Sequence, residues 1–425
     1  MEMLAVSNQV QTQANLTRTK VLVFIFCFLS LLADGADLMF LSYSLSSLRQ
    51  EFGLSSFEAG SLGSITLAGM AIGGIYGGWA SDRFGRVKVL FWATILFSIF
   101  TAGLGFTHSY WQFAVVRFIS ALGLGSVFVA CNTLMSEYVS TKYRTTVLGT
   151  LQAGWTVGYV VATLVAGAII PEHGWRWMFF LAIVPVVVAL LIKPYVPEPP
   201  AWLAAQAERL RNKKNVTGAA VPQKAGSLRT IFADKITRRM FVLWTLTGGL
   251  LQFGYYGVNN WLPSYLEREL SMDFKSMTGY MLGTYAAMII GKIGAGFAAD
   301  WMGRRKTYVT GCLATALLIP IIVYFNSPEN ILFLLVFFGF VYGTSMGVVA
   351  TYMTESFPTP IRGAAIGGAY NFGRIGAAFA PAIIGLMAAQ VSIAAGMLVM
   401  ALAYMLTALI PALYIRDKIY DPQKA

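Results

Sequence analysis

Residues Gly78–Arg86 read GWASDRFGR, and Gly296–Arg304, 218 residues later, read GFAADWMGR. The second stretch keeps the first and last glycines, the aspartate and the final arginine of the first in the same register. Other pairs keep this offset without a gap: Asp82/Asp300, Arg86/Arg304, Lys88/Lys306, Glu137/Glu355, Arg144/Arg362 and Gly149/Gly367. A repeat of about half the chain is typical of a duplicated helical bundle, whereas solenoid repeats are about 20–50 residues long. We therefore expect two copies of one structural unit.

The composition places both units in a lipid bilayer. Of the 425 residues, 57% are hydrophobic and 12% are charged, which is about half the charged fraction of an average soluble protein. A membrane-spanning helix needs about 20 mainly apolar residues. Twelve such stretches are present, centred near residues 33, 69, 98, 125, 159, 186, 253, 288, 316, 344, 375 and 403. The sequence predicts an all-α membrane protein with twelve transmembrane helices in two pseudo-symmetric six-helix bundles.

The polar segments set the expected boundaries. Residues 1–19 form an N-terminal tail, 20–197 the first six-helix bundle, 198–238 a linker, 239–416 the second bundle and 417–425 a C-terminal tail. The linker is too short to hold a hydrophobic core of its own. This organisation argues against an enzyme domain anchored to the membrane.

The net charge of +12 is explained by where the cations lie. Most Lys and Arg residues fall in the N-terminal tail, in alternate short loops, in the linker and near the C-terminus. The loops of the opposite set contain four, namely Arg49, Arg176, Arg268 and Lys275. This asymmetry is the positive-inside pattern. It predicts a multi-pass protein of a bacterial-type inner (plasma) membrane with both termini in the cytoplasm, and it leaves no charge that would require a nucleic-acid partner.

The segment Gly78–Arg86 resembles the G-x-x-x-D-R-x-G-R signature of the major facilitator superfamily, and the second copy replaces the first arginine by Trp301. The resemblance covers essentially the whole chain. It implies two bundles that alternate between inward-open and outward-open forms around a central cavity. It also implies a gate of charged residues at the helix ends, although these charges could simply fix the topology. Gly78 is expected where a neighbouring backbone approaches closely. The expected gating residues are Gly78, Asp82, Arg83, Arg86, Glu137, Arg144, Asp300, Arg304, Glu355 and Arg362.

Two acidic residues lie inside the first predicted helix. Asp34 and Asp37 are three positions apart and therefore share one face. An ionisable group inside a membrane is costly unless it is paired or hydrated, so it indicates function by default. Two nearby carboxylates in a low-dielectric site favour the exchange of a proton, as a proton-coupled transporter requires. The alternative is that each only pairs with a neighbouring helix or bonds to backbone.

The segment Asp34–Asp37, which reads DGAD, resembles the D-G-x-D signature of the aromatic acid:proton symporter family, with Ala36 where Phe or a similar residue is usual. The resemblance implies that Asp34 and Asp37 are needed for proton-coupled uptake and leaves open which of them carries the proton. Arg117 begins the pattern R-x-x-x-A-x-G-x-G, whose small residues allow close helix packing. We expect Arg117 within reach of Asp37, where it either takes part in coupling or contacts the substrate.

Two further cations break the repeat. Arg374 lies near the centre of the eleventh predicted helix, where the repeat places Thr156, and Lys292 in the eighth corresponds to Gly74. A guanidinium without a carboxylate in its own half suits an anionic substrate, and both cations together could hold two carboxylates. Alternatively, backbone carbonyls satisfy Arg374, and Lys292 extends toward the cytoplasmic surface.

Polar and aromatic side chains at the depth of these charges complete the expected substrate site. Rings can stack on a planar acid, and amides can fix its orientation. Besides Arg374 and Lys292, the expected set comprises Tyr43, Asn132, Gln152, Trp155, Gln252, Tyr255, Tyr256, Asn259, Asn260, Tyr370 and Asn371.

The predicted function is proton-driven import of a small organic carboxylate by a monomeric transporter without a cofactor. Members of the family that the DGAD segment resembles take up benzoate-like acids, hydroxybenzoates, nicotinate or cis,cis-muconate. Lys292 together with Arg374 favours a dicarboxylate such as muconate. The segment Gln152–Trp155, which reads QAGW, also resembles sialate and lactate symporters, so that subfamily remains an alternative.

Three other functions are less well supported. Drug:proton antiporters carry a Gly/Pro-rich motif in the fifth helix, but Tyr159 stands where that motif places Pro. A transporter-like receptor would be expected to carry a long cytoplasmic extension, which the linker does not provide. The sequence also contains no metal-ligand cluster, nucleophile motif or phosphate-binding loop that would indicate an enzyme.

Overall fold

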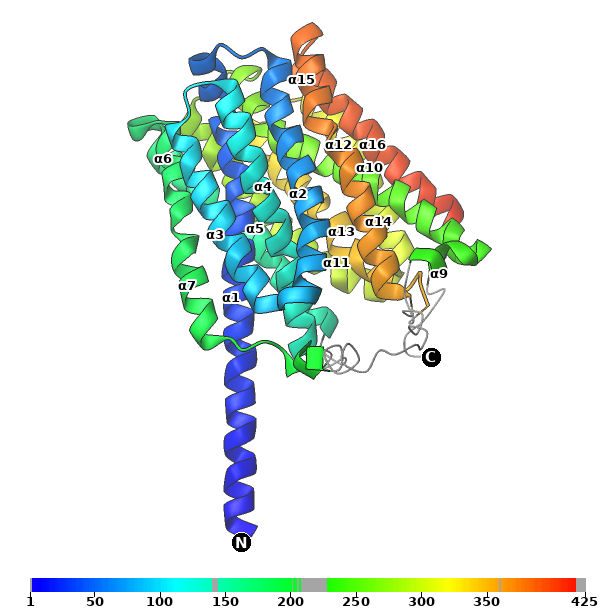
Figure 1. Cartoon of the computed structure of the whole chain (residues 1–425). Helices are drawn as coiled ribbons and strands as arrows, with labels where there is room; N and C mark the ends of the chain where they lie inside the picture. The colour runs from blue at the N-terminus through cyan, green and yellow to red at the C-terminus, as the bar shows by residue number, and fades with distance from the viewer. Residues whose placement is uncertain are drawn as a thin grey trace.

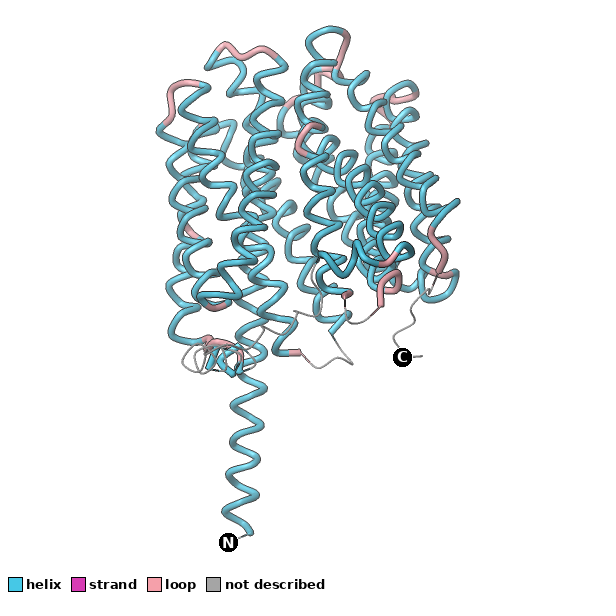
Figure 2. Tube along the Cα trace, turned by 45° about the vertical axis from the view of Figure 1, so that its right-hand side comes forward, coloured by secondary structure: helices cyan, strands magenta, loops and turns pink. Residues whose placement is uncertain are grey.

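The computed structural model describes residues 2–139, 144–200, 202–204, 206–207, 228–358 and 361–417, and every regular element in them is helical (Figure 2). The helices of the first half are α1 (Glu2–Phe52), α2 (Ser56–Phe84), α3 (Arg86–Gly103), η1 (Leu104–Phe106), α4 (Tyr110–Tyr138), α5 (Arg144–His173), α6 (Trp175–Phe180), η2 (Leu181–Ile183) and α7 (Pro185–Tyr195). Those of the second half are α9 (Leu228–Ala233), α10 (Lys235–Arg268), α11 (Phe274–Met302), α12 (Arg304–Tyr324), α13 (Ile331–Thr354), α14 (Arg362–Ala377), α15 (Ala380–Gln390) and α16 (Ile393–Tyr414).

The 218-residue repeat reappears in the helix boundaries. α2 and α11 begin and end at equivalent positions, and α3 and α12 begin at equivalent positions. The turn between these helices uses a glycine with positive φ in each half, 119° at Gly85 and 95° at Gly303. Only glycine adopts such a conformation without strain. The repeat is therefore a repeat of backbone geometry as well as of sequence.

Equivalent acidic residues hold each half together at its helix ends. Glu51 accepts hydrogen bonds from the Trp175 indole and the Arg176 guanidinium at the start of α6. Glu269, its repeat equivalent, accepts from the backbone amides of Ile393 and Ala394 at the start of α16. The free amides at the start of α16 attract the Glu269 carboxylate, whereas Glu51 uses side-chain donors. These contacts tie the end of α1 to the start of α6, and the end of α10 to the start of α16.

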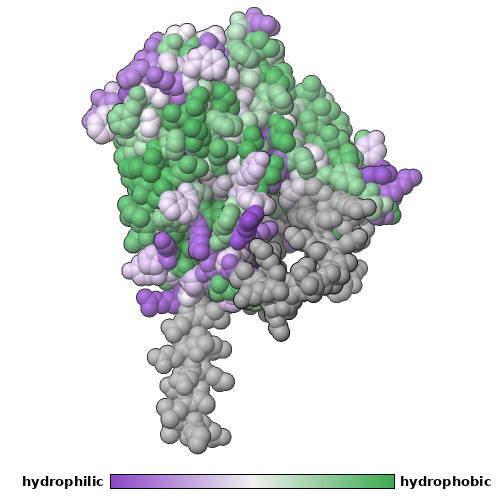
Figure 3. All heavy atoms as spheres, in the orientation of Figure 1, coloured by the Kyte–Doolittle hydropathy of each residue, from purple (hydrophilic) through white to green (hydrophobic). Residues whose placement is uncertain are grey.

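Eleven spans in the described part of the chain are long and apolar enough to cross a membrane. The seventh helix, α10, misses this criterion, although twelve apolar stretches were expected. α10 packs against α1, α14 and α16 and buries Gln252, Asn259 and Asn260. A helix surrounded by other helices can carry polar residues that a lipid-facing helix cannot. Figure 3 shows a broad hydrophobic band between hydrophilic ends on the face that it presents.

Several predicted helices differ in extent or continuity from the expectation, and the sixth is divided into α6, η2 and α7. α1 starts at Glu2, well before the expected start at residue 20. The eleventh predicted helix is divided into α14 and α15, which are separated by Ala378 and Phe379. Pro381 lies in the first turn of α15 and cannot donate the backbone hydrogen bond that a continuous helix needs there. Arg374 therefore lies in the last turn of α14.

The two halves are in direct contact at the face opposite the repeated motifs. We call the face that carries Asp82 and Arg86 the motif face; α1 starts and α16 ends there (Figure 1). At the opposite face α2 packs against α15, and a Cβ atom at Gly60 would overlap the carbonyl of Pro381. There, the Arg268 guanidinium also donates to the hydroxyl and the carbonyl of Ser46, both at 3.0 Å. The structure is thus closed at the face opposite the motifs.

Within the first half, glycines let α2 and α4 approach at backbone distance. A Cβ atom at Gly125 would overlap the carbonyl oxygen of Met70, and one at Gly73 would overlap that of Leu122. A Cβ at Gly78, where the sequence suggested a close approach, would make an ordinary contact of 3.5 Å with Val129. The close approach is one residue earlier, at Gly77, where an added Cβ would lie 2.7 Å from the Cα of Ser126.

We predict that Gly125→Ala destabilises the protein, because the added methyl group forces α2 and α4 apart. Overpacking of this kind costs about 1–3 kcal/mol. Gly279→Ala is the matched control, since Gly279 is exposed in α11 with no neighbouring atom within 4 Å of an added Cβ. Thermal unfolding in detergent should show a lower transition temperature for the first variant alone. Equal transition temperatures would contradict the close packing.

Candidate functional site

A buried ion pair joins α1 to α4. Arg117 Nη1 donates to Asp37 Oδ2 at 2.7 Å, and both side chains are at most 1% exposed. Arg117 Nε donates to the hydroxyl of Thr66 on α2 at 2.9 Å, and its Nη2 reaches the Asp37 carbonyl at 3.4 Å. All three guanidinium nitrogens are therefore bonded. The ion pair and its hydrogen bonds therefore connect α1, α2 and α4 of the first half.

Asp34 lies in a different environment on the same helix. Its side chain is fully buried, and no described residue donates a hydrogen bond to either carboxylate oxygen. The charged groups close enough to act on it are those of Arg374, Asp37 and Arg117. Asp34 therefore lies near cations without a direct ion pair.

Arg374 reaches from the second half toward an aromatic residue of the first. Its guanidinium carbon lies 5.1 Å from the ring centre of Phe128 on α4 and 5.4 Å from that of Tyr370. The two rings are nearly parallel, with centres 6.2 Å apart. The side chain is fully buried, and none of its three nitrogens makes a hydrogen bond to a described residue. The hydroxyl of Tyr256 lies nearby, outside hydrogen-bond geometry. Cation–π contacts leave the donors of a guanidinium free for a ligand.

Lys292 also crosses between the halves. Its Nζ donates to the hydroxyl of Thr156 on α5 at 2.7 Å, so it does not extend toward the membrane surface. One turn earlier on α5, Gln152 donates to the side-chain oxygen of Asn132 at 2.9 Å. Between them Trp155 makes an edge contact with Phe128, with ring centres 5.2 Å apart. One face of α5 thus connects the surroundings of Lys292 with those of Arg374.

Other expected substrate residues are bonded within their own half. Gln252 donates to the Tyr370 carbonyl at 3.0 Å, and Asn259 donates to the Tyr255 carbonyl and the Tyr342 hydroxyl. The Tyr43 hydroxyl hydrogen-bonds to Thr163 at 2.7 Å, and the Asn371 amide donates to its own helix at Gly367. The structure therefore brings Tyr370, Trp155 and Tyr256 to Arg374, whereas Tyr43 and Asn259 contribute to the packing of their bundles.

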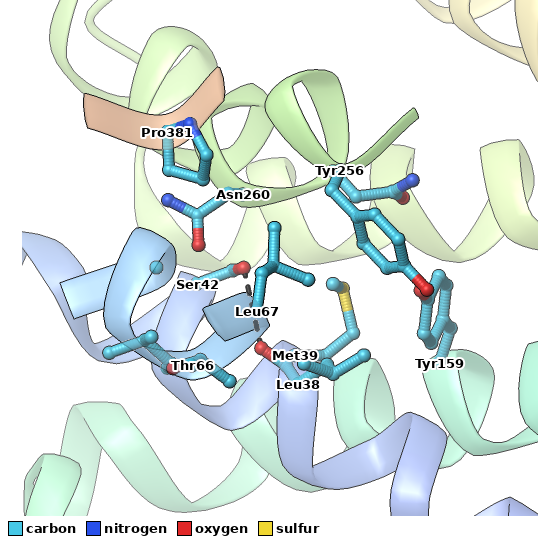
Figure 4. Close-up of a pocket in the computed structure, with 12 residues that line it drawn as sticks. Leu38, Met39, Ser42, Thr66, Leu67, Tyr159, Tyr256, Asn260 and Pro381 are labelled. Carbon is cyan, nitrogen blue, oxygen red and sulfur yellow. Dashed lines mark hydrogen bonds between the residues drawn. The ribbon is translucent and has the colours of Figure 1, made fainter. Parts of the chain in front are cut away.

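A small pocket lies between the halves on the opposite-face side of the charges (Figure 4). Thr66, which bonds to Arg117, lines it, and Tyr159 and Tyr256 lie together at one end. Asn260 and Pro381 line the other end, and the Asn260 amide nitrogen makes no hydrogen bond to a described residue. The pocket therefore places polar groups next to the contact between α2 and α15, which closes this face and which we call the seam.

The charged residues of the motif face form one equivalent network in each half. Arg86 pairs with Asp82 at 3.0 Å and with Glu137 at 2.9 Å. Arg304 pairs with Asp300 and Glu355, both at 3.0 Å. Each network joins the turn after one helix to the end of another helix of the same half. These contacts stiffen each bundle at its end.

The remaining charged gating residues are Arg83, Arg144 and Arg362. Arg83 is exposed and stacks on the rings of Trp79 and Phe84, at 5.4 and 5.6 Å. The side chains of Arg144 and Arg362 lie outside the described part of the structure. A third carboxylate, Glu198, accepts hydrogen bonds from the first backbone amides of α3, including that of Arg86 at 2.7 Å.

The placement of the charges and the duplicated bundle indicate one fold family, and a comparison with family models identifies that family. The model described as Major Facilitator Superfamily matches residues 27–293 and 273–424. The chain belongs to the major facilitator superfamily. The fold predicted from the motif is therefore confirmed, and this major facilitator protein is a multi-pass membrane transporter, not an enzyme.

Relatives with assigned names agree with the DGAD signature. The chain is 62% identical over 409 residues to a cis,cis-muconate transport protein of Acinetobacter baylyi, covering 96% of this chain and 97% of the relative. A 4-hydroxybenzoate transporter of the same species is 24% identical, covering 86% and 84%. Among solved structures, a D-xylose-proton symporter superposes with a TM-score of 0.77 at 21% identity, covering 94% and 99%. The last likeness concerns the fold alone.

Phe128 and Thr156 are contact residues that the sequence prediction did not include in the site. Phe128 lies eleven residues after Arg117 and four before Asn132, so all three lie on one face of α4. That spacing could have indicated Phe128. Thr156 was noted only as the repeat equivalent of Arg374, and its contact with Lys292 depends on how the halves pack.

We predict that Thr66→Val weakens the structure around Arg117, because the buried Nε would lose its acceptor. An unsatisfied buried donor costs about 1–3 kcal/mol. Thr284→Val is the matched control: Thr284 is the repeat equivalent, is equally buried, and donates only to the Tyr280 carbonyl of its own helix among described contacts. Thermal or denaturant unfolding should show a larger loss of stability for Thr66→Val. Equal losses would contradict the contribution of the Arg117 contact.

Proposed function

We propose that this transporter imports a small, planar dicarboxylate of the cis,cis-muconate type together with protons. The observation that carries the proposal is Arg374, a fully buried guanidinium whose nitrogens have no hydrogen-bond acceptor among described residues. Buried charges without partners are unfavourable, and a carboxylate offers the bidentate acceptor that a guanidinium fits. The high identity to a relative named as a muconate transporter supports the same substrate class.

The surroundings of Arg374 suit a conjugated acid. Phe128 and Tyr370 present nearly parallel rings that both contact the guanidinium, and Trp155 makes an edge contact with Phe128. A planar conjugated carbon chain packs against such rings more closely than a bent aliphatic one. Lys292 supplies a second cation from the same half as Arg374, so two carboxylates of one molecule can each meet a positive charge.

Proton coupling fits the two buried aspartates of α1. An anion that enters a bilayer-embedded site near Asp34 is repelled unless a proton accompanies it. We further propose that the protein acts as a monomer in a bacterial plasma membrane, with the motif face in the cytoplasm. In that orientation the structure is closed toward the outside, and rocking of the two halves would open the opposite face to take up substrate.

The direct test is uptake by proteoliposomes that contain the purified protein. An external pH below the internal pH should drive accumulation of labelled cis,cis-muconate, and a protonophore should abolish it. Benzoate and 4-hydroxybenzoate in excess report how strictly the site requires two carboxylates. Muconate uptake that ignores the pH gradient would contradict proton coupling, and no saturable uptake would contradict the substrate class.

We predict that Arg374→Ala lowers muconate affinity at least about tenfold, which corresponds to about 1.4 kcal/mol. The loss follows because no other described cation contacts the rings of Phe128 and Tyr370. Lys88→Ala, at an exposed position near the motif face, is the control for loss of a positive charge. Direct binding to the purified variants measures both. Similar losses would indicate a folding or gating defect instead of a lost ligand contact.

We also predict that Lys292→Met changes selectivity. Without the ammonium group, muconate should bind at least about tenfold more weakly, whereas benzoate, with a single carboxylate, should bind almost as before. Thr156→Val removes the hydrogen-bond acceptor of Lys292 but keeps its charge, and should have the smaller effect. Competition binding with both acids separates the outcomes. An equal loss for muconate and benzoate would exclude Lys292 as the second carboxylate contact.

A further inference from the structure

The two aspartates of α1 differ in what surrounds them. Asp37 is paired with Arg117, and Arg117 is in turn held by Thr66. If Asp37 took up a proton, the guanidinium would remain buried at 0% exposure without a counter-ion. Removing one partner from a buried pair is strongly unfavourable. The buried guanidinium therefore needs the Asp37 carboxylate as its counter-ion as long as this pair persists.

Asp34 has no such compensation. It is as deeply buried as Asp37, yet no described residue donates a hydrogen bond to its carboxylate. An ionised carboxylate is poorly tolerated in such a place, whereas the neutral acid needs fewer donors. The ionisable groups that act on or lie near it are Asp37 on its own helix, Arg117 and Cys131 on α4, Tyr256 on α10 and Arg374 on α14.

Arg374 and Asp34 lie on opposite halves and act on each other without touching. Arg374 is close enough for its charge to act on Asp34, but no ion pair within 4.0 Å joins them in the described structure. Both side chains keep their hydrogen-bonding atoms unused. A carboxylate placed between them would accept hydrogen bonds from the guanidinium and from a protonated Asp34. An ionised Asp34 would instead repel it.

We propose that Asp34 carries the coupled proton, and that Asp37 with Arg117 is a permanently charged positioning pair that holds α1 against α2 and α4. This assignment rests on the proposed function. A proton from water on one side binds to the Asp34 carboxylate and makes it neutral. The substrate carboxylate then binds between Asp34 and Arg374, the halves rock, and the anion leaves on the other side. The proton follows it to water, which regenerates ionised Asp34.

The test compares Asp34→Asn with Asp37→Asn in detergent and in proteoliposomes. In the wild type, muconate binding should take up about one proton at pH values where free Asp34 is ionised, so affinity should fall about tenfold per pH unit as pH rises. Asp34→Asn mimics the protonated acid. It should bind muconate with no proton uptake at Asp34 and lose this pH dependence. It should also keep muconate exchange across the membrane and lose accumulation driven by the pH gradient.

Asp37→Asn should show the opposite pattern. It leaves Arg117 unpaired and should lower thermal stability, while the protein that remains folded still takes up a proton when muconate binds. Thr66→Val perturbs the same pair more mildly and should also keep proton uptake. Asp34→Asn should be at least as stable as the wild type, because Asp34 has no described hydrogen-bond partner to lose. Failure of Asp34→Asn to fold would therefore contradict the proposal, and so would proton uptake that persists in Asp34→Asn but disappears in Asp37→Asn and in Thr66→Val.

A ligand-free measurement separates this assignment from the proposed function. Infrared difference spectra across a pH titration report the C=O stretch of a protonated carboxylic acid. Because the chain contains 19 Asp and Glu residues, the readout is the component of that band that the wild type and Asp37→Asn share and that Asp34→Asn lacks. If the wild type neither binds nor transports muconate, the substrate class is wrong, and the infrared band still decides which aspartate binds the proton. A band that survives in Asp34→Asn would overturn the assignment.

Discussion

A charge inside a lipid bilayer must be compensated, and much of this structure follows from that constraint. Arg117 and Asp37 neutralise each other's charge within the first half, and the guanidinium also donates to Thr66 and to the Asp37 carbonyl. Because this compensation is local, it persists while the two bundles move relative to each other. The uncompensated charges, Asp34 and Arg374, lie on different halves. The chain thus separates the charges that build a bundle from those that face the space between bundles.

The duplicated sequence was a reliable guide to the parts that serve the fold. The 218-residue offset matches the ends of α2 and α11 and the starts of α3 and α12, because both copies use the same turn with a positive-φ glycine. It also relates Arg86 to Arg304 and Glu137 to Glu355, which form equivalent ion pairs in the two halves. Apolar stretches located eleven spans, and α10 was recognised by sequence although its polar residues make it less apolar than its neighbours. Such features depend on local or repeated sequence, so they can be predicted from the sequence of one chain.

Features that depend on packing between halves were less accessible. Sequence spacing placed Asp34 and Asp37 on one face but could not distinguish their surroundings, since Arg117 and Arg374 approach from different helices. Lys292 was left between a substrate contact and a surface position, and its hydrogen bond to Thr156 is decided by the contact of α11 with α5. The close approach expected at Gly78 lies at Gly77, because the sequence alone does not show which of two adjacent residues on α2 faces α4.

The seam at the opposite face has a consequence for how the protein responds to its solution. Its closest contacts are made by backbone and small residues: Gly60 with Pro381, Gly385 with Ser56, and the Ser64 hydroxyl with the Ala382 amide. Arg268 joins them through uncharged groups of Ser46. Salt screens interactions between exposed ions and has little effect on buried neutral contacts. Ionic strength should therefore have little influence on how often this face opens. A larger side chain at Gly60 or Gly385, by contrast, would keep α2 and α15 apart.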